Sequence, residues 1–313
     1  MNTNAGKTTL ALYSYVYRLI ADHLGDMRYR VVYYSLEMTG EILMAKILSL
    51  HIFETYGVEL SYKQIMSRQE ILSDKHLALV ESCEPWLEQF EKQLLIVDKN
   101  VSSSGIYASL SEYSKSHGTF IEGEYSDVYE PYIKDELVLI VVDHLGLINL
   151  LQGQTKKDAM DLTSKYLLRF RNKCAYSPLV LLQINRGQAN MLRVKESRQE
   201  IELSDIKDSG GPSEDAEVVL AIFHPWREKM TSHKDYNIRI LKNHYRAVQV
   251  LKARLGESDK SIGLNFFGSI GLWREMPEPR SLQENDMEQF LHLQPPKKEV
   301  EVKPTPVNFK MRF

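Results

Sequence analysis

The sequence predicts an α/β fold built on a mostly parallel sheet with helices on both faces. Short β-branched and apolar runs, apolar on both faces, alternate along the chain with segments whose apolar residues recur at spacings of three and four. A strand that is apolar on both faces must be covered on both sides, and helical crossovers between parallel strands provide that cover.

The elements follow one another in a regular order. The expected strands are Arg30–Ser35, Leu94–Val97, Leu137–Asp143, Leu179–Gln183 and Val218–Phe223. The expected helices are Lys7–Asp22, Gly40–Glu54, Asp74–Gln89, Gly105–His117 and Lys157–Cys174. Shorter runs in hairpin order then occupy Asn237–Lys242, Val248–Ala253 and Ile262–Phe267, and the pattern ends near Trp273. We expect these last strands to extend the same sheet as an antiparallel C-terminal extension.

We expect one domain over residues 1–279, followed by a flexible tail over residues 280–313. Proline and charge dominate the end of the tail, which offers little apolar surface for a core. The acidic, tyrosine-rich residues 119–134 are predicted to be an insertion loop or hairpin, with a structural role favoured over a partner site.

Composition narrows the class of protein. The chain has 313 residues, of which 43% are hydrophobic, and it has 39 basic and 42 acidic residues. This composition is that of a globular protein and excludes intrinsic disorder for most of the chain. Any nucleic-acid binding must use local clusters of cations, because the net charge is −3. No apolar run approaches the roughly 20 residues of a membrane span, and the two cysteines form no metal or disulfide pattern. We expect a soluble cytoplasmic protein.

A candidate phosphate-binding loop opens the first helix. The run Asn4-Ala5-Gly6-Lys7-Thr8-Thr9 matches the second half of GxxxxGK[ST], in which backbone amides and the lysine bind phosphates and the hydroxyl binds Mg²⁺. The alternative is an ordinary helix start. The first glycine of the motif would fall on Met1, and the strand that leads into such a loop is absent. We therefore expect the sequence to lack the N-terminal part of the fold.

Polar side chains follow three of the expected strands. Asp143 ends an apolar strand, as a Walker B carboxylate beside Mg²⁺ does. Glu37 follows the strand ending in Ser35 and could orient an attacking water, and Gln183 could sense a γ-phosphate. Each residue also has an ordinary structural explanation. Asp143 could simply end a buried strand, Glu37 could be a favourable acidic residue at a helix N-terminus, and Gln183 could cap a helix or loop.

Taken in order, these segments resemble the C-terminal motor domain of DnaB-like replicative helicases, a family of RecA-like P-loop ATPases. The segments are AGKTT, YYSLEM, LIVVDHLGLI, LLQINR and SDIKDSGGPSEDAEVVLAIFHP, and the resemblance covers roughly residues 1–275. YSLEM and SDIKDSG with EDAE are the most specific, since general RecA-like ATPases share the nucleotide motifs alone.

The resemblance implies a role for each matching residue. Lys7 and Thr8 would bind ATP and Mg²⁺, Asp143 would be the Walker B ligand, Glu37 the catalytic carboxylate and Gln183 the γ-phosphate sensor. A strand with a K-x-R pattern would supply an arginine finger to the neighbouring subunit. We place this pair at Lys242 and Arg246, although Arg246 is displaced by two residues from the pattern.

The resemblance also implies partners. Single-stranded DNA would pass through the channel of a homo-hexamer, with primase and a helicase loader as further partners, in a bacterium or a phage-infected cell. The matching DNA-binding stretch holds Lys207, Asp208 and Gly210. Two further basic loops carry Lys156 and Lys157, and Arg193, Lys195 and Arg198, for which solvated loops are the alternative.

Two other functions remain open from the sequence. The first is a RecA- or KaiC-like ATPase without helicase activity, against which the YSLEM and KDSG segments argue. The second is a truncated, non-catalytic remnant of a helicase, which the missing first strand favours.

Overall fold

The structure is a computed structural model that describes residues 5–67, 71–123, 127–183, 200–209, 211–282 and 284–294. The helices are α1 (Lys7–Ala11), the π-helical turn η1 (Leu12–Tyr17), α2 (Arg18–Ala21), α3 (Gly40–Tyr56), α4 (Tyr62–Ile65), α5 (Asp74–Ser82), α6 (Glu84–Glu91), α7 (Ser103–His117), η2 (Leu145–Leu147), α8 (Lys156–Cys174), η3 (Leu203–Ser209), α10 (Gly211–Asp215), α11 (Ile238–Leu241), η4 (Lys242–His244), η5 (Pro279–Ser281), α12 (Glu284–Glu288) and η6 (Gln289–Leu291). The strands are β1 (Tyr29–Ser35), β2 (Leu94–Val97), β3 (Gly118–Ile121), β4 (Val128–Pro131), β5 (Leu137–Asp143), β6 (Ser177–Val180), β7 (Val218–Phe223), β8 (Ser232–His233), β9 (Tyr236–Asn237), β10 (Tyr245–Ala253), β11 (Ser261–Phe267) and β12 (Leu272–Glu275).

The parallel sheet has the order β2-β1-β5-β6, and helices cover both of its faces as predicted. Alternate residues of β1 and β5 enter two different cores. Val31 and Val141 pack with the first helix and α3, whereas Val32 and Ile140 pack with α7 and α8. Strands β1 and β5 pair from Tyr29↔Leu137 to Ser35↔Asp143, so their carboxyl ends lie side by side.

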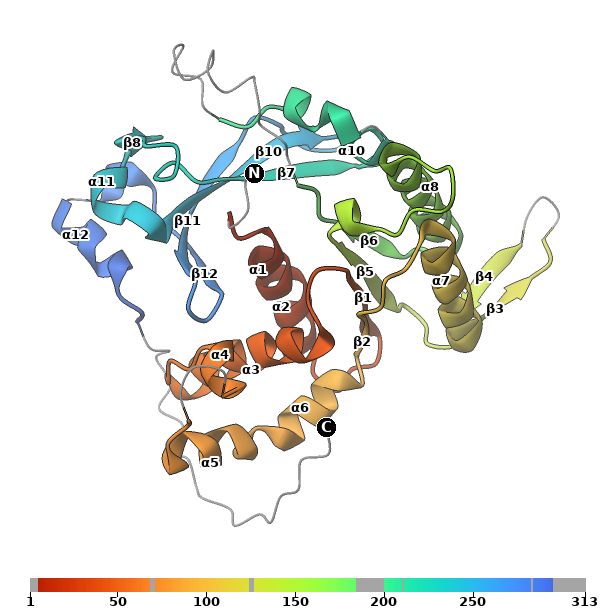
Figure 1. The fold of residues 1–313 in the computed structure, drawn as a ribbon, viewed down its shortest axis with the longest axis horizontal. Coiled ribbons are helices and arrows are strands. Elements are labelled where there is room, and N and C mark those ends of the chain that lie inside the picture. The colour runs from red at the N-terminus through yellow and green to blue at the C-terminus, as the bar shows by residue number, and fades with distance from the viewer. Residues whose placement is uncertain are drawn as a thin grey trace.

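The C-terminal strands are antiparallel, as predicted, but they form a sheet of their own with the order β12-β11-β10-β7 (Figure 1). The predicted strand Asn237–Lys242 is wrong, because most of this segment is the helical turn α11. The side chain of Asn237 accepts a hydrogen bond from the Arg239 N–H and caps the turn. Ile238 and Leu241, three residues apart, are both fully buried, which is the spacing of a helix.

Two peripheral segments can be compared with their predictions. Residues 119–134 do contain a hairpin, in which β3 and β4 pair beside α7 at the edge of the molecule (Figure 1).

The segment predicted to be a flexible tail needs correction at its start, because residues 284–294 include α12 and η6. Met287 is 5% exposed in the core of the antiparallel sheet, and the Asn265 amide donates to the Phe290 carbonyl. Apolar side chains within QENDMEQFLHL supply this packing.

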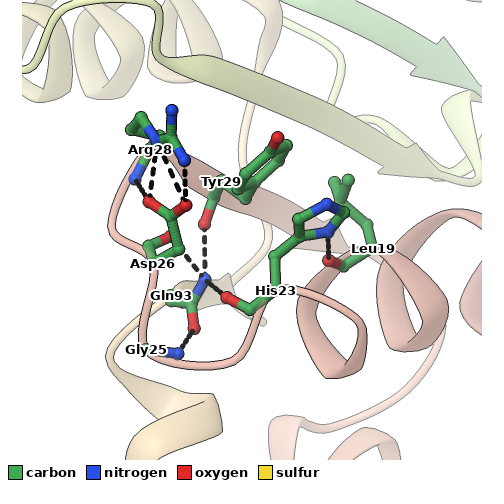
Figure 2. Close-up of polar contacts among 7 residues, drawn as sticks. All are labelled: Leu19, His23, Gly25, Asp26, Arg28, Tyr29 and Gln93. Carbon is green, nitrogen blue, oxygen red and sulfur yellow. Dashed lines mark hydrogen bonds and ion pairs between the residues drawn. The ribbon is translucent and has the colours of Figure 1, made fainter.

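A buried glutamine fixes the turn that leads from α2 into β1. The Gln93 side chain, 1% exposed, donates to the backbone carbonyls of His23, Asp26 and Tyr29 and accepts from the Gly25 N–H (Figure 2). A single amide thus contacts four backbone groups of a turn that also has backbone bonds of its own, from the Asp26 N–H to the His23 carbonyl and from the Tyr29 N–H to the Asp26 carbonyl. This sets where β1 begins, and hence where Ser35 and Glu37 lie at its other end.

A mostly apolar cavity of about 620 Å³ separates the two sheets. It lies between β6 and β7, which are edge strands that do not pair with each other in the described part of the chain. Side chains of α1 and α8 close it, and Ala5 and Lys7 lie at its border. The lining is mostly apolar, and its charged members are Lys7, Arg171, Asp215 and Glu217.

One buried histidine makes the fold sensitive to acid. His51 on α3 is 9% exposed, stacks on Trp86 with ring centroids 3.7 Å apart, and burial lowers its pKa to about 4. The folded state keeps the imidazole neutral while the unfolded chain takes up a proton near pH 6.5. The free energy of unfolding therefore decreases as the pH falls below about 6.5. The decrease due to His51 is about 2 kcal/mol between pH 7 and pH 5.

Urea unfolding of the wild type and of His51→Phe at pH 7 and pH 5 checks this expectation. Phenylalanine keeps the stack on Trp86 but has no proton to bind, so the variant should lose about 2 kcal/mol less than the wild type over this range. Equal losses in the two proteins would show that His51 does not titrate as proposed.

Candidate phosphate-binding site

The loop that enters α1 has the local geometry of a phosphate-binding loop. Gly6 caps the helix with φ = 96°, in the left-handed region that favours glycine. Its carbonyl accepts hydrogen bonds from the Leu10 N–H at 2.8 Å and the Thr9 hydroxyl at 2.9 Å. The helix then continues without a break through η1 and α2 to residue 21, so its first amides and its dipole face the loop.

Gly6 is also required by its neighbour on the antiparallel sheet. A Cβ built on Gly6 would lie 2.6 Å from Cζ2 of Trp273, which is closer than carbon atoms can approach. Trp273 on β12 is 3% exposed and stacks on Phe266 with centroids 4.2 Å apart. The loop is thus held against a rigid aromatic surface.

Thr8 and Asp143 meet at the centre of the site. The Thr8 hydroxyl donates to Oδ1 of Asp143 at 3.1 Å, and the Tyr33 hydroxyl donates to Oδ2 at 2.7 Å. Asp143 is 1% exposed, because the parallel sheet and α1 enclose it. The two residues predicted to share a Mg²⁺ ion, 135 positions apart in the sequence, are brought into contact.

Burial and charge set the pKa values of this cluster. Burial lowers the pKa of the Lys7 ammonium, while the carboxylates of Asp143 and Glu37 act in the opposite direction. Burial raises the pKa of Asp143, and hydrogen bonds from Tyr33 and Thr8 partly offset this rise. Lys7, Asp143 and Glu37 therefore interact electrostatically within one site, as the sequence predicts.

Glu37 lies on the turn that follows β1, and its side chain is exposed. The Leu36 N–H donates to the Asp143 carbonyl at 2.7 Å, and the Ser35 hydroxyl donates to the Met38 carbonyl. These two bonds fix the turn against the end of β5. A solvent-accessible carboxylate is thereby held beside the Asp143–Lys7 pair.

Gln183 follows β6 on the same edge of the sheet, and its side chain is exposed. The backbone of Leu181 bonds to Val142 and Leu145, which ties this strand end to the end of β5. Lys156 and Lys157 are exposed in the first turn of α8, which the Thr155–Asp158 capping box begins. Lys156 also acts electrostatically on His144, so it lies near the same edge.

The predicted finger residues occupy different environments. Lys242 is exposed at a tight turn with φ = 45°. Arg246 on β10 is 4% exposed, and its Nε donates to the carbonyl of Ala5 in its own chain at 3.3 Å. Lys242 is therefore open to solvent, whereas Arg246 is buried against the Ala5 carbonyl of its own loop.

A second basic pair on β10 was missed by the sequence prediction. Lys252-Ala253-Arg254 reproduces the K-x-R spacing without displacement, at the end of a strand and before a turn. Arg254 is about half exposed, with its Nη1 3.1 Å from Glu217 Oε1, and Lys252 donates to backbone carbonyls of α10. The K-x-R spacing in the sequence is the signal for this second candidate pair.

Most of the predicted DNA-binding residues cannot be placed. Arg193, Lys195, Arg198 and Gly210 lie outside the described residues, as does Asn4 of the predicted phosphate-binding loop. Of Lys207 and Asp208 only the backbone in η3 is described. The surrounding segment is anchored, since the Gly211 N–H donates to Asp161 and the Ser164 hydroxyl donates to Asp215. The segment η3–α10 thus packs along α8, the helix that begins with Lys156.

The donor set fits a nucleotide triphosphate with Mg²⁺. A glycine loop at a helix N-terminus, a lysine, a threonine hydroxyl and a carboxylate surround one point, and Mg²⁺ prefers such oxygen ligands together with phosphate oxygens and water. Within the described residues, no group of three or more His, Cys, Asp or Glu side chains could hold a metal ion unaided. None of the helices in the described part of the chain is long and apolar enough to span a membrane.

Comparisons with known proteins agree with this geometry. The family model described as DnaB-like helicase C terminal domain matches residues 2–274. The fold is similar to the solved "ATPase Domain of G40P", with a TM-score of 0.63 and 16% identity over 88% of this chain and 82% of that one. It is also similar to a DnaB-like replicative helicase solved with its interactions with primase, with a TM-score of 0.60 and 16% identity over 86% of this chain and 54% of that one. No curated protein matches the sequence.

Replacing Gly6 tests the contact that shapes the loop. Gly6→Ala should cost about 1–3 kcal/mol more in unfolding free energy than Gly153→Ala, measured by urea denaturation. Gly153 is the matched control, because its φ of 78° imposes the same left-handed strain while nothing lies within 4 Å of an added Cβ. In a Trp273→Phe background, the extra cost of Gly6→Ala should shrink. Equal costs at the two glycines would rule out the clash with Trp273.

Proposed function

Since the chain belongs to the DnaB-like helicase C-terminal domain family, we propose that it is an ATP-hydrolysing motor that moves along single-stranded DNA during replication. The observation that carries this proposal is the hydrogen bond between Thr8 and Asp143, with Lys7 and Glu37 beside it. It supports a nucleotide site in which the residues expected for phosphates, Mg²⁺ and water already lie together.

In the proposed mechanism, Lys7 and the amides of the Gly6 loop neutralise and orient the phosphates of ATP. Thr8 and Asp143 would hold Mg²⁺, which would supply positive charge to the phosphate oxygens. The burial that raises the pKa of Asp143 means that its carboxylate is poorly solvated. A cation bound there would compensate for the lost solvation of this carboxylate.

Glu37 would orient the attacking water and accept its proton. The water oxygen bonds to the γ-phosphorus as the bond from that phosphorus to the bridging oxygen breaks, giving ADP and inorganic phosphate. The exposure of Glu37 supports this role, because solvent water reaches its carboxylate directly. Gln183, at the neighbouring strand end, would respond to the γ-phosphate.

A cation from the next subunit would complete the site. Two pairs are candidates, Lys242 with Arg246 and Lys252 with Arg254. The undisplaced K-x-R spacing favours Lys252 and Arg254, and so does the exposure of Arg254 in contrast to the burial of Arg246. Lys252 and Arg254 lie at the end of β10 and contact the segment around α10. A finger at this position would couple hydrolysis to the packing of α10 on α8.

Single-stranded DNA would contact Lys156 and Lys157 in the first turn of α8, and the stretch holding Lys207, Asp208 and Gly210. The packing of η3 and α10 along α8 supports a common surface for the two segments. Arg193, Lys195 and Arg198 would add charge. A ring of copies would concentrate these few cations although the net charge of one chain is −3.

Hexamer formation and contacts with primase and a helicase loader are part of the same proposal. The family match supports a ring, and one structurally similar helicase was solved with its primase interactions.

ATP turnover by the purified chain, with and without single-stranded DNA, tests the proposed function. DNA should raise the rate, Lys7→Ala should abolish nucleotide binding, and Glu37→Gln should bind ATP yet hydrolyse it at least 100-fold more slowly. Turnover indifferent to DNA would favour an ATPase with another role. Absence of both binding and turnover would favour a non-catalytic remnant, and normal turnover by Glu37→Gln would remove that residue from its role.

Mixing two inactive variants tests whether a neighbouring subunit supplies a cation to the nucleotide site. Lys7→Ala and Arg254→Ala should each be inactive, but a 1:1 mixture should recover up to about a quarter of the wild-type rate, because about a quarter of the interfaces then join an intact Lys7 to an intact Arg254. The recovered rate should follow the mixing ratio and peak at equal amounts. No recovery at any ratio would contradict a site shared between subunits through Arg254.

A further inference from the structure

Arg246 is placed where it can act on the loop of its own chain. The arginine is the second residue of β10. Its guanidinium donates three hydrogen bonds, all to backbone carbonyls: to Ala5 at 3.3 Å, to Asn243 at 2.7 Å and to Tyr245 at 2.8 Å. Of these acceptors, only Ala5 lies far away in sequence.

The face of the antiparallel sheet around Arg246 forms a continuous support. Arg246 pairs with Leu264, and Phe266 lies two residues further along the same face of β11. The guanidinium lies 5.2 Å from the Phe266 ring centre, and Phe266 pairs across the strands with Trp273, its stacking partner. Trp273 in turn closes against Gly6. Arg246 and Trp273 thus contact the loop, and the Phe266 ring supports both of them.

The bond to Ala5 has a directional consequence. In a trans peptide the carbonyl of one residue and the N–H of the next point to opposite sides. Holding the Ala5 carbonyl toward Arg246 therefore aims the Gly6 N–H away from it, on the side where loop amides receive phosphate oxygens. A guanidinium is suited to this task, since it remains protonated and has no acceptor that could compete.

We propose that Arg246 is a positioning residue that orients the phosphate-binding loop of its own chain by holding the Ala5 carbonyl. This inference rests on the proposed nucleotide-binding function. In this role Arg246 acts within its own chain, and it does not serve as an arginine finger for the neighbouring subunit. At 4% exposure, with three intrachain bonds and a ring beneath it, the side chain would have to leave all of these contacts to cross a subunit boundary.

Burial lowers the pKa of Arg246 to about 10, and the nearby Arg227 acts in the same direction. The side chain therefore remains charged at neutral pH, and the bond to the Ala5 carbonyl is charge-assisted. Lysine in its place would keep the charge but lose the planar fork that reaches three carbonyls at once.

Nucleotide affinity and loop protection together test the proposal. The full chain, Arg246→Gln, Arg246→Lys and the control Arg28→Gln are titrated with ATP carrying a methylanthraniloyl fluorophore. Arg28 pairs with Asp26 at an exposed site, so its variant removes an arginine charge without touching the loop. We expect Kd to rise about tenfold for Arg246→Gln, about threefold for Arg246→Lys and not at all for Arg28→Gln.

Hydrogen–deuterium exchange of residues 5–12 is measured on the same proteins without nucleotide. Arg246→Gln should exchange faster in this peptide, and Arg28→Gln should match the wild type. If the wild type binds no nucleotide, the proposed function fails, but this exchange still decides the role of Arg246. If circular dichroism shows that Arg246→Gln does not fold, Arg246→Lys decides by both readouts. Wild-type affinity and wild-type exchange in a folded variant would overturn the proposal.

Mixing with Lys7→Ala separates the two possible roles of Arg246. If Arg246 serves the loop of its own chain, each substitution impairs the nucleotide site of the chain that carries it. No site in the mixture is then intact, so the ATPase rate of the mixture should not exceed the summed rates of its two components. Recovery in the mixture would overturn the role within one chain and return Arg246 to a finger.

Discussion

The site depends on a threonine at the start of one helix meeting an aspartate at the end of a strand. Thr8 donates to Asp143, and this bond joins α1 to the edge of the parallel sheet at which β1, β5 and β6 all end. A carboxylate that is 1% exposed needs partners, and Thr8 and Tyr33 supply them. Glu37 and Gln183 are functional candidates because the strands that precede them share this edge.

The phosphate loop is held by both sheets. From the parallel sheet it receives the Asp143 carboxylate, and from the antiparallel sheet it receives Trp273 against Gly6 and Arg246 on the Ala5 carbonyl. Between these two anchors lies the apolar cavity bordered by the edge strands β6 and β7. The geometry of the loop therefore depends on how the parallel and antiparallel sheets are placed relative to each other. A change in the antiparallel sheet can alter the phosphate-binding loop, although Asp143 belongs to the parallel sheet.

Sequence patterns predicted those features whose cause is local or periodic. The apolar runs of β1 and β5 identify strands buried on both faces, because residues such as Val31 and Val32 must both find a core. The pattern failed at Asn237–Lys242, where Ile238 and Leu241 suit a strand by composition but an asparagine cap starts a helical turn. It also failed at residues 284–294, where charge suggested a tail but Met287 fills the core of the antiparallel sheet.

By itself the sequence determined the class of fold and the alternation of strands and helices in the parallel sheet, and it predicted that Lys7, Thr8, Glu37 and Asp143 form one chemical set. These follow from residue type, periodicity and spacing along the chain. Only the tertiary structure decided that the last strands form a separate sheet and that Arg246 is buried against Ala5. Its contacts join residues up to 241 positions apart, and no local pattern encodes which side of a folded molecule a strand will face.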